Sequence, residues 1–276
     1  MGLYLGCNVK NKQEFYSMSV LIEEAESINH AVRLIKAASH VVAFTGAGIS
    51  TPSGIPDFRS PDSGMWKQVD PFRVASIAGF RRDPSAFFRW VRPLAKLSLL
   101  AKPNDAHDAL FKLEQIGKLK SIITQNIDTL HTKAGNRVVH ELHGQIHEAT
   151  CISCYKHFSA EKLIENFVET GEIPRCDCER KSILKPNVIL FGEQLPFKTL
   201  QAAKKAVRAC DILLVIGSSL EVAPASDLPL LARRNGARII IVNESATDYD
   251  RMADIVVKGD AAKLLPTIVQ QVENAI

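Results

Sequence analysis

Short, unbroken runs of apolar residues, each followed by glycine or polar residues, constrain the fold of this chain most. Such runs are typical of parallel strands that are covered on both faces, because a half-exposed strand would alternate apolar and polar residues. The runs lie at residues 41–44, 121–124, 188–191, 212–216, 238–242 and, more weakly, 255–257. Helical patterns separate several of them, at residues 23–38, 106–116, 197–209, 225–235 and 261–272. This alternation predicts an α/β fold with an open, mostly parallel sheet.

Two long segments interrupt the alternation. Residues 61–105 carry prolines, aromatic residues and arginines, and residues 147–185 hold four of the six cysteines. We predict that both form a smaller lobe, inserted into a large part made of residues 27–60, 106–146 and 186–272. In an open α/β fold, a lobe beyond the carboxyl ends of the strands makes a place for a ligand. Residues 1–26 are expected to be an N-terminal extension of a functional unit that spans 27–272.

The composition excludes several classes of protein. A chain of 276 residues that is 46% hydrophobic with a net charge of +4 is too apolar and too weakly charged to be disordered. Six cysteines are too few for a disulfide scaffold, and no uncharged apolar run reaches the ~18 residues that a membrane span needs. The mild charge gives no reason to expect nucleic-acid binding. Because residues 1–17 lack the apolar core of an export signal, we expect a cytoplasmic protein.

Four cysteines form two close pairs, Cys151 with Cys154 and Cys176 with Cys178. A C-x2-C pair points two thiolates at one tetrahedral ion, and a second pair completes the ligand shell. The second pair has one intervening residue, which departs from the common spacing but still permits chelation. Four sulfur ligands leave no open position, so the sequence predicts a structural zinc rather than a catalytic one. The alternative is four unrelated cysteines.

Polar residues follow several strands where the strands end. Gly46-Ala47-Gly48 comes after the first strand, and glycines there let backbone amides approach a pyrophosphate. The third glycine of the dinucleotide-binding pattern is absent, so a tight turn without a ligand is the alternative. Residues 124–128, with the sequence TQNID, follow the second strand, and His143 precedes a glycine. A histidine in such a place can act as a base near pH 7, although a lone histidine is more often structural.

Two further strands end in polar residues, which can bond a second ribose or its base. These residues are Ser218 and Ser219 after one strand, and Asn243 and Glu244 after the other. Helix capping by either serine is the alternative reading. A loop at residues 51–60 combines two prolines with Asp57 and Arg59, so it is a candidate lid over a phosphate or a plain surface loop.

Taken together, these residues resemble the sirtuin family of NAD-dependent protein-lysine deacylases. The resemblance covers residues 27 to 272 and rests on motifs in the family's order and spacing. The motifs are GAGIS at 46–50, GIPDFRS at 54–60, TQNID at 124–128, HG at 143–144, the four cysteines, KPNVILFGE at 185–193, GSSLEV at 217–222 and VNE at 242–244. It implies a Rossmann-like large part, a smaller lobe that contains a zinc-binding module, and NAD and one structural zinc as cofactors.

The resemblance also implies a role for individual residues. His143 would be the general base, and Asn126 and Asp128 would fix the nicotinamide amide. The residues that would bind NAD are Gly46, Ala47, Gly48, Asp57, Phe58, Arg59, Gln125, Asn126, Ile127, Asp128, Gly217, Ser218, Ser219, Asn243 and Glu244. Ile189, Phe191 and Val222 would wall a tunnel for the acyl-lysine stem, and Gly192 and Glu193 would flank the substrate peptide. Cys151, Cys154, Cys176 and Cys178 would bind the zinc.

The substrate implied is an acylated lysine in a protein, whose acyl group is transferred to ADP-ribose with release of nicotinamide. Relatives that prefer succinyl-lysine carry a tyrosine and an arginine three apart after the cofactor loop. Residues 64–68 here lack that pair, which favours acetyl or another uncharged acyl group. The alternatives are mono-ADP-ribosyl transfer from the same NAD site and a catalytically silent NAD-sensing module. We expect a monomer.

Overall fold

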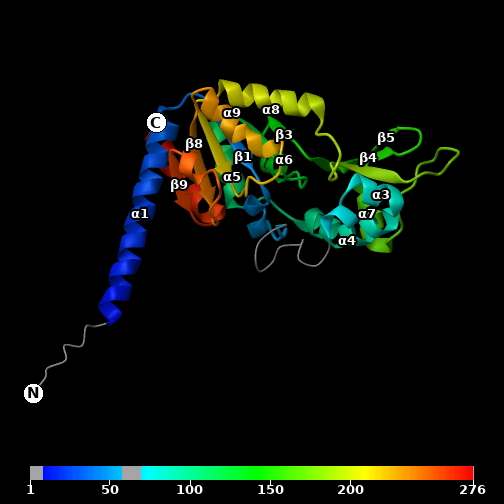
Figure 1. Cartoon of the computed structure of the whole chain (residues 1–276), viewed down its shortest axis with the longest axis horizontal. Coiled ribbons are helices and arrows are strands. Elements are labelled where there is room, and N and C mark those ends of the chain that lie inside the picture. The colour runs from blue at the N-terminus through cyan, green and yellow to red at the C-terminus, as the bar shows by residue number, and fades with distance from the viewer. Residues whose placement is uncertain (1–8, 58–69, 276) are drawn as a thin grey trace, which may run out of the picture.

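The computed structural model describes residues 9–57 and 70–275 and contains a six-stranded parallel sheet beside a smaller lobe (Figure 1). The strands of the large sheet lie in the order β3-β2-β1-β7-β8-β9. Their bounds are β1 Val41–Thr45, β2 Leu119–Thr124, β3 Val139–Glu141, β7 Ile212–Ile216, β8 Arg238–Asn243 and β9 Ile255–Lys258. Every residue of β1 and β7 is buried, as the unbroken apolar runs predict.

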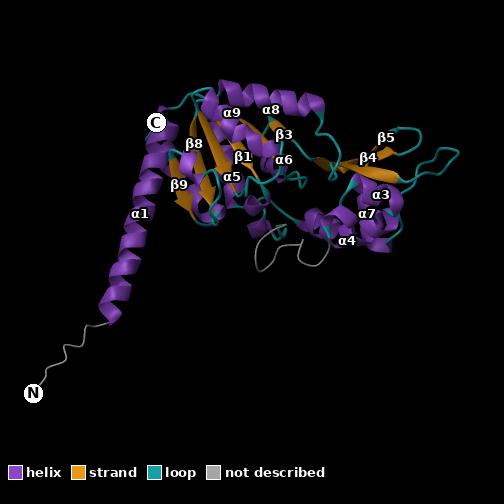
Figure 2. Cartoon of the chain, viewed as in Figure 1, coloured by secondary structure: helices purple, strands orange, loops and turns teal. Residues whose placement is uncertain are grey.

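Helices cover both faces of this sheet (Figure 2). On one face α1 (Val9–Ala37), α5 (Asp105–Gln115) and α10 (Ala261–Glu273) pack around a core with Ile35, Leu110 and Leu265. On the other face α8 (Phe197–Ala209) and α9 (Leu228–Arg234) pack around a core with Val207 and Leu228. A doubly covered parallel sheet in this order is the Rossmann-like architecture expected from the sequence.

Two helices differ from their predicted bounds. Helix α1 begins at Val9 rather than at residue 23, and it extends away from the rest of the molecule toward its N-terminus (Figure 1). No glycine or proline lies between Val9 and Ala37, so nothing in the local sequence ends the helix. The stretch expected as one helix at 225–235 is divided into a 3-10 turn at Ala225–Asp227 and helix α9.

Among the described residues, the smaller lobe combines a three-stranded antiparallel sheet with four helices. The sheet has the order β5-β4-β6, with β4 at Gly144–Cys151, β5 at His157–Ser159 and β6 at Leu184–Val188. The helices are α2 (Pro71–Val74), α3 (Ile77–Arg82), α4 (Pro84–Leu100) and α7 (Glu161–Thr170). The chain enters this sheet directly from the end of β3, because Leu142 and His143 alone separate β3 from β4.

The prediction of a strand at residues 188–191 in the large sheet was wrong. Val188 ends β6, which pairs antiparallel with β4, and Phe191 makes an isolated bridge with Ser76. The physical reason lies in the hydrogen bonds that this segment makes. The Ile189 N–H donates to His143 O over 2.8 Å, so the backbone joins the connection between β3 and β4 instead of an edge of the large sheet.

The crossover in strand order falls between β1 and β7, which are neighbours although about 170 residues separate them in the chain. From β1 the chain builds the sheet toward β3, and from β7 it builds toward β9. The connections after these two strands therefore lead to opposite halves of the sheet, and open α/β sheets bind ligands at the carboxyl ends of the strands at such a point. Among the residues described, helices long and apolar enough to cross a membrane are absent.

Candidate functional site

Glycines hold the loops after β1 and β7 in direct backbone contact. The Gly46 N–H donates to Ile216 O over 3.0 Å, and the Gly48 N–H donates to Gly217 O over 2.8 Å. A Cβ atom on Gly46 would lie 2.7 Å from Gly217 O, and one on Gly48 would lie 2.8 Å from Gly217 Cα. Gly217 itself has a φ of +58°, which disfavours other residues. These glycines are therefore required by the approach of the two loops to each other. Ala47 opens the 3-10 turn Ala47–Ile49.

Ser50 joins the first loop to two polar residues that follow β2. Its hydroxyl donates to Asp128 Oδ2 over 2.8 Å and accepts from Asn126 Nδ2 over 3.1 Å. The same Asn126 amide donates to Gly46 O over 3.1 Å, and the Leu130 N–H donates to Asp128 Oδ1 over 2.9 Å. These bonds bring Asn126 and Asp128 to the loop at Gly46–Gly48, called the glycine loop below.

Burial changes the electrostatics of this cluster. It raises the pKa of Asp128, although hydrogen bonds from Leu130 and Ser50 act in the opposite direction. It also raises the pKa of Glu141 at the end of β3 to about 7, with further contributions from the charges of Asp128 and Glu148. The site therefore holds two carboxyl groups that resist ionisation more than exposed carboxyl groups do.

His143 lies at the start of the lobe, with its ring fixed from one side. Its Nδ1 is 2.8 Å from Gln125 O. Because a carbonyl oxygen can only accept, Nδ1 carries the proton, and in the neutral ring Nε2 is then the proton acceptor. Gln125 is held in turn, since its N–H donates to Thr45 O over 2.9 Å and its Oε1 accepts from Ser218 Oγ over 2.9 Å. The tautomer is the one that a general base requires.

Ser218 and Asn243 hold the loop after β7 against the end of β8. The Ser218 N–H donates to Asn243 Oδ1 over 3.1 Å, and Asn243 Nδ2 donates to Ser218 O over 2.7 Å. Both residues are buried, so these bonds satisfy polar groups that water does not reach. Ser219 and Glu244, the next residue in each case, are exposed. Ser218 and Asn243 thus shape the loop after β7, whereas Ser219 and Glu244 face solvent.

Sequence reasoning missed a support beneath the glycine loop. Asn104, which caps α5, donates from Nδ2 to Ile49 O over 2.8 Å and to Ser53 Oγ over 2.9 Å. His131 Nε2 lies 2.9 Å from Thr45 Oγ1, and the His131 ring packs against that of His107, with centroids 4.9 Å apart and the planes tilted by 52°. Burial lowers the pKa of His107 to about 4 and that of His131 well below its usual value, so both are neutral. An asparagine before a helical pattern was the one available signal.

The four paired cysteines converge in the smaller lobe. Their sulfur atoms all lie within 4.8 Å of one another, with Cys151 and Cys178 Sγ 3.9 Å apart and Cys154 and Cys176 Sγ 3.7 Å apart. Zinc–sulfur bonds of about 2.3 Å place the sulfurs of a tetrahedral site about 3.8 Å apart. Backbone hydrogen bonds from Cys154 and Ser153 lower the pKa of Cys151, whereas burial raises the pKa of Cys176. The residues therefore fit a zinc ion, and the one-residue spacing of the second pair does not prevent it.

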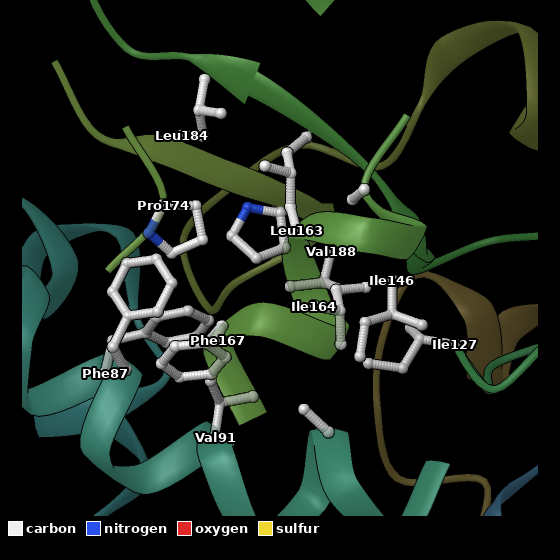
Figure 3. Close-up of a pocket in the computed structure, with 15 residues that line it drawn as sticks. Phe87, Val91, Ile127, Ile146, Leu163, Ile164, Phe167, Pro174, Leu184 and Val188 are labelled. Carbon is white, nitrogen blue, oxygen red and sulfur yellow. The ribbon is translucent and has the colours of Figure 1, made fainter. Parts of the chain in front are cut away.

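An apolar pocket adjoins the candidate site from the lobe side (Figure 3). Ile127, which stands between Asn126 and Asp128, lines it, as does Val188, which pairs with Gly144 next to His143. Its other lining residues include Phe87, Val91, Ile146, Leu163, Phe167 and Leu184. The predicted tunnel residues Ile189, Phe191 and Val222 are not part of this lining, and all three are half-buried. Phe191 instead packs on Phe72, with ring centroids 5.3 Å apart.

Comparison with known families identifies the chain. The Sir2 family matches residues 46–224. The chain belongs to the Sir2 family. It is 45% identical to NAD-dependent protein deacylase 2 of Archaeoglobus fulgidus, over 90% of this chain and 97% of that protein. It also resembles a solved Sir2 enzyme structure with a TM-score of 0.86 and 44% identity, over 91% of this chain and 99% of the other.

A third relative bears on ligands. The structure of Sir2Af2 bound to a myristoylated histone peptide matches with a TM-score of 0.78 and 39% identity, over 91% of this chain and 98% of that one. In the present chain, the predicted NAD residues that follow β1, β2, β7 and β8 lie at the carboxyl ends of these strands, around the β1–β7 crossover. Asp57 is half-buried at the end of that loop, and Phe58 and Arg59 lie outside the described residues. The succinyl-specificity stretch 64–68 also lies outside them.

Proposed function

We propose that this sirtuin removes acyl groups from lysines of proteins with NAD as the co-substrate. The observation that carries the proposal is the bonded cluster of Asn126, Ser50 and Asp128 beside His143, whose Nδ1 is fixed on Gln125 O. Residues that follow the neighbouring strands β1, β2 and β3 supply this cluster, and β1 borders the crossover of the sheet. The names of the relatives, an NAD-dependent protein deacylase among them, support the same reaction.

NAD, when bound, supplies the ADP-ribose that accepts the acyl group, with nicotinamide as the leaving group. The proposed part of His143 is to accept the proton of a ribose hydroxyl at Nε2, because its Nδ1–H stays on Gln125 O. Asn126 and Asp128 are proposed to orient the nicotinamide end. Ser50 keeps their side chains in place, which removes the need to order them at the moment of reaction.

The acyl group is proposed to be uncharged, either acetyl or a longer apolar chain. Ionisable side chains are absent among the residues that line the pocket beside Ile127, so a carboxylate on the acyl group would lose its hydration without gaining a partner. The myristoylated peptide bound by Sir2Af2 shows that a relative accepts a long chain.

A mass-spectrometric assay with NAD and a panel of acylated peptides tests the proposal. We expect free lysine peptide, nicotinamide and acylated ADP-ribose in equal amounts. Nicotinamide release with ADP-ribose attached to protein would favour mono-ADP-ribosyl transfer instead. Binding of NAD without any release of nicotinamide would favour the sensing module.

Other expectations from the sequence remain proposals. We propose that residues 27–272 form the catalytic unit, that the protein is a monomer without affinity for nucleic acid, and that it acts in the cytoplasm.

A further inference from the structure

Lys185 and Glu193 form an ion pair at the base of the loop that follows β6. Lys185 Nζ lies 3.0 Å from Glu193 Oε2, and the two side chains are only 14% and 23% exposed. By contrast, the surface pair of Lys156 and Asp177 is 57% and 72% exposed. Because water and salt screen the first pair much less, its attraction is stronger than that of an exposed pair.

Each partner of this ion pair also bonds the backbone of the loop. Lys185 Nζ donates to Val188 O over 2.9 Å and to Pro186 O over 3.3 Å. Glu193 Oε2 accepts the Leu190 N–H over 2.8 Å, and the Glu193 N–H donates to Leu190 O over 2.9 Å. The pair therefore fixes the course of the backbone from the last residue of β6 to Glu193.

The same loop contacts the candidate general base and the smaller lobe. The Ile189 N–H donates to His143 O over 2.8 Å. Two residues later, the Phe191 N–H donates to Ala75 O over 2.9 Å, and Phe191 O accepts from the Ile77 N–H over 3.0 Å. A change in the course of the loop would thus displace the backbone both at His143 and in the smaller lobe.

We propose that Lys185 is a positioning residue for the substrate peptide. This inference rests on the proposed function, in which Gly192 and Glu193 flank the acylated peptide as an added strand. An added strand gains its affinity from main-chain hydrogen bonds, so the receiving backbone must already have the right course. Lys185 does not need to touch the peptide, because it holds Glu193 and the Val188 carbonyl, and these two hold the loop.

Replacement of Lys185 by Met tests the proposal. Met keeps the length of the apolar stem but removes the charge and the donors. We expect KM for an acetylated peptide, and Kd for that peptide measured by fluorescence anisotropy, to rise about tenfold. We expect Kd for NAD to stay within about twofold, because the glycine loop is not part of this contact. Lys185→Arg should restore most of the affinity, since Arg still donates to a carboxylate and a carbonyl.

Arg233 and Asp254 provide a matched control. Asp254 Oδ2 accepts from Arg233 Nη1 over 2.8 Å and from the Ile239 N–H over 2.9 Å, so it repeats the arrangement of Glu193 at the start of β8. Arg233→Met should leave peptide affinity unchanged. If Lys185→Met lowers the yield of folded protein, Glu193→Gln, which keeps an oxygen for the Leu190 N–H, is measured in the same way.

Three results would overturn the inference. The first is wild-type peptide KM and Kd in folded Lys185→Met or Glu193→Gln, and the second is an equal loss in Arg233→Met. The third is a parallel loss of NAD affinity. A wild-type protein that releases nicotinamide with acetylated peptide but gives one of these results refutes the positioning role alone. A wild-type protein that neither binds nor deacylates any acylated peptide refutes the proposed function, and the positioning role with it.

Discussion

Replacement of Gly217 by Ala isolates the contact between the loops after β1 and β7. A Cβ atom at this position would lie 2.4 Å from Ile49 N and 2.6 Å from Gly48 C, and both are backbone atoms that cannot rotate away. Ordinary contacts of a Cβ atom begin at 3.4 Å, so the loops must separate by about 1 Å. The φ of +58° adds a second penalty, because only glycine adopts it without strain.

The two penalties have different magnitudes and different consequences. A left-handed backbone at a residue other than glycine costs about 1–2 kcal/mol, and forced repacking adds about 1–3 kcal/mol. We therefore expect Gly217→Ala to lower the free energy of unfolding by about 3 kcal/mol. The 1 Å displacement also falls on the loop that is proposed to receive the pyrophosphate. Misplacement of that size in a binding site costs up to about 100-fold in kcat/KM, and we expect this for NAD.

Gly236→Ala is a control that introduces the backbone strain of a positive φ without displacing a neighbouring loop. Gly236 has a φ of +87°, and a Cβ atom there would meet nothing within 4 Å. The Gly236→Ala variant should lose only about 1 kcal/mol in its free energy of unfolding and keep its affinity for NAD. Calorimetric titration with ADP-ribose and urea unfolding of both variants provide the measurements. An affinity of Gly217→Ala within twofold of that of Gly236→Ala would refute the reasoning that this close approach builds the NAD site.

Three other variants test separate parts of the molecule. Cys151→Ser should release the single zinc ion and destabilise the smaller lobe while the large sheet keeps its structure; metal analysis that finds one zinc per folded variant chain would contradict this. His143→Tyr should abolish deacylation and leave NAD affinity within about threefold, and full activity in the peptide assay would exclude His143 as the base. Burial raises the pKa of Glu141 from 4.5 to about 7, so the folded chain binds the extra proton and loses stability as pH rises between these values. Relative to wild type, Glu141→Gln should therefore raise the free energy of unfolding by on the order of 1 kcal/mol more at pH 8 than at pH 5, as measured by urea unfolding. The same pH dependence in the variant and the wild type would contradict the raised pKa of Glu141.

The sequence was sufficient for those parts of the fold that depend on local patterns. Unbroken apolar runs predicted the buried parallel strands β1 and β7, because such runs have no solvent-facing side. The paired cysteines predicted a metal cluster, because ligand spacing within a pair is itself local.

Contacts between distant segments account for what the sequence did not predict. The run at 188–191 has the composition of a buried strand, but its partner is the connection at His143 rather than the large sheet. Composition alone does not choose between two buried partners. Asn104 and His131 were missed for a related reason, since their role depends on segments more than fifty residues away. The long course of α1 was missed because residues 9–22 lack a clear apolar period.

Hydrogen bonds within the protein hold the polar side chains of the candidate site in place without a ligand. Buried polar groups without hydrogen-bond partners cost about 1–3 kcal/mol each. If these groups found partners only in bound NAD, the protein without NAD would be destabilised by that amount for each group. Here Ser50 satisfies both Asn126 and Asp128, and Ser218 and Asn243 satisfy each other. The positions of these side chains are thereby fixed by the protein. Ordering them then adds little to the cost of binding, and this is the condition under which a few polar contacts can hold a large, flexible dinucleotide.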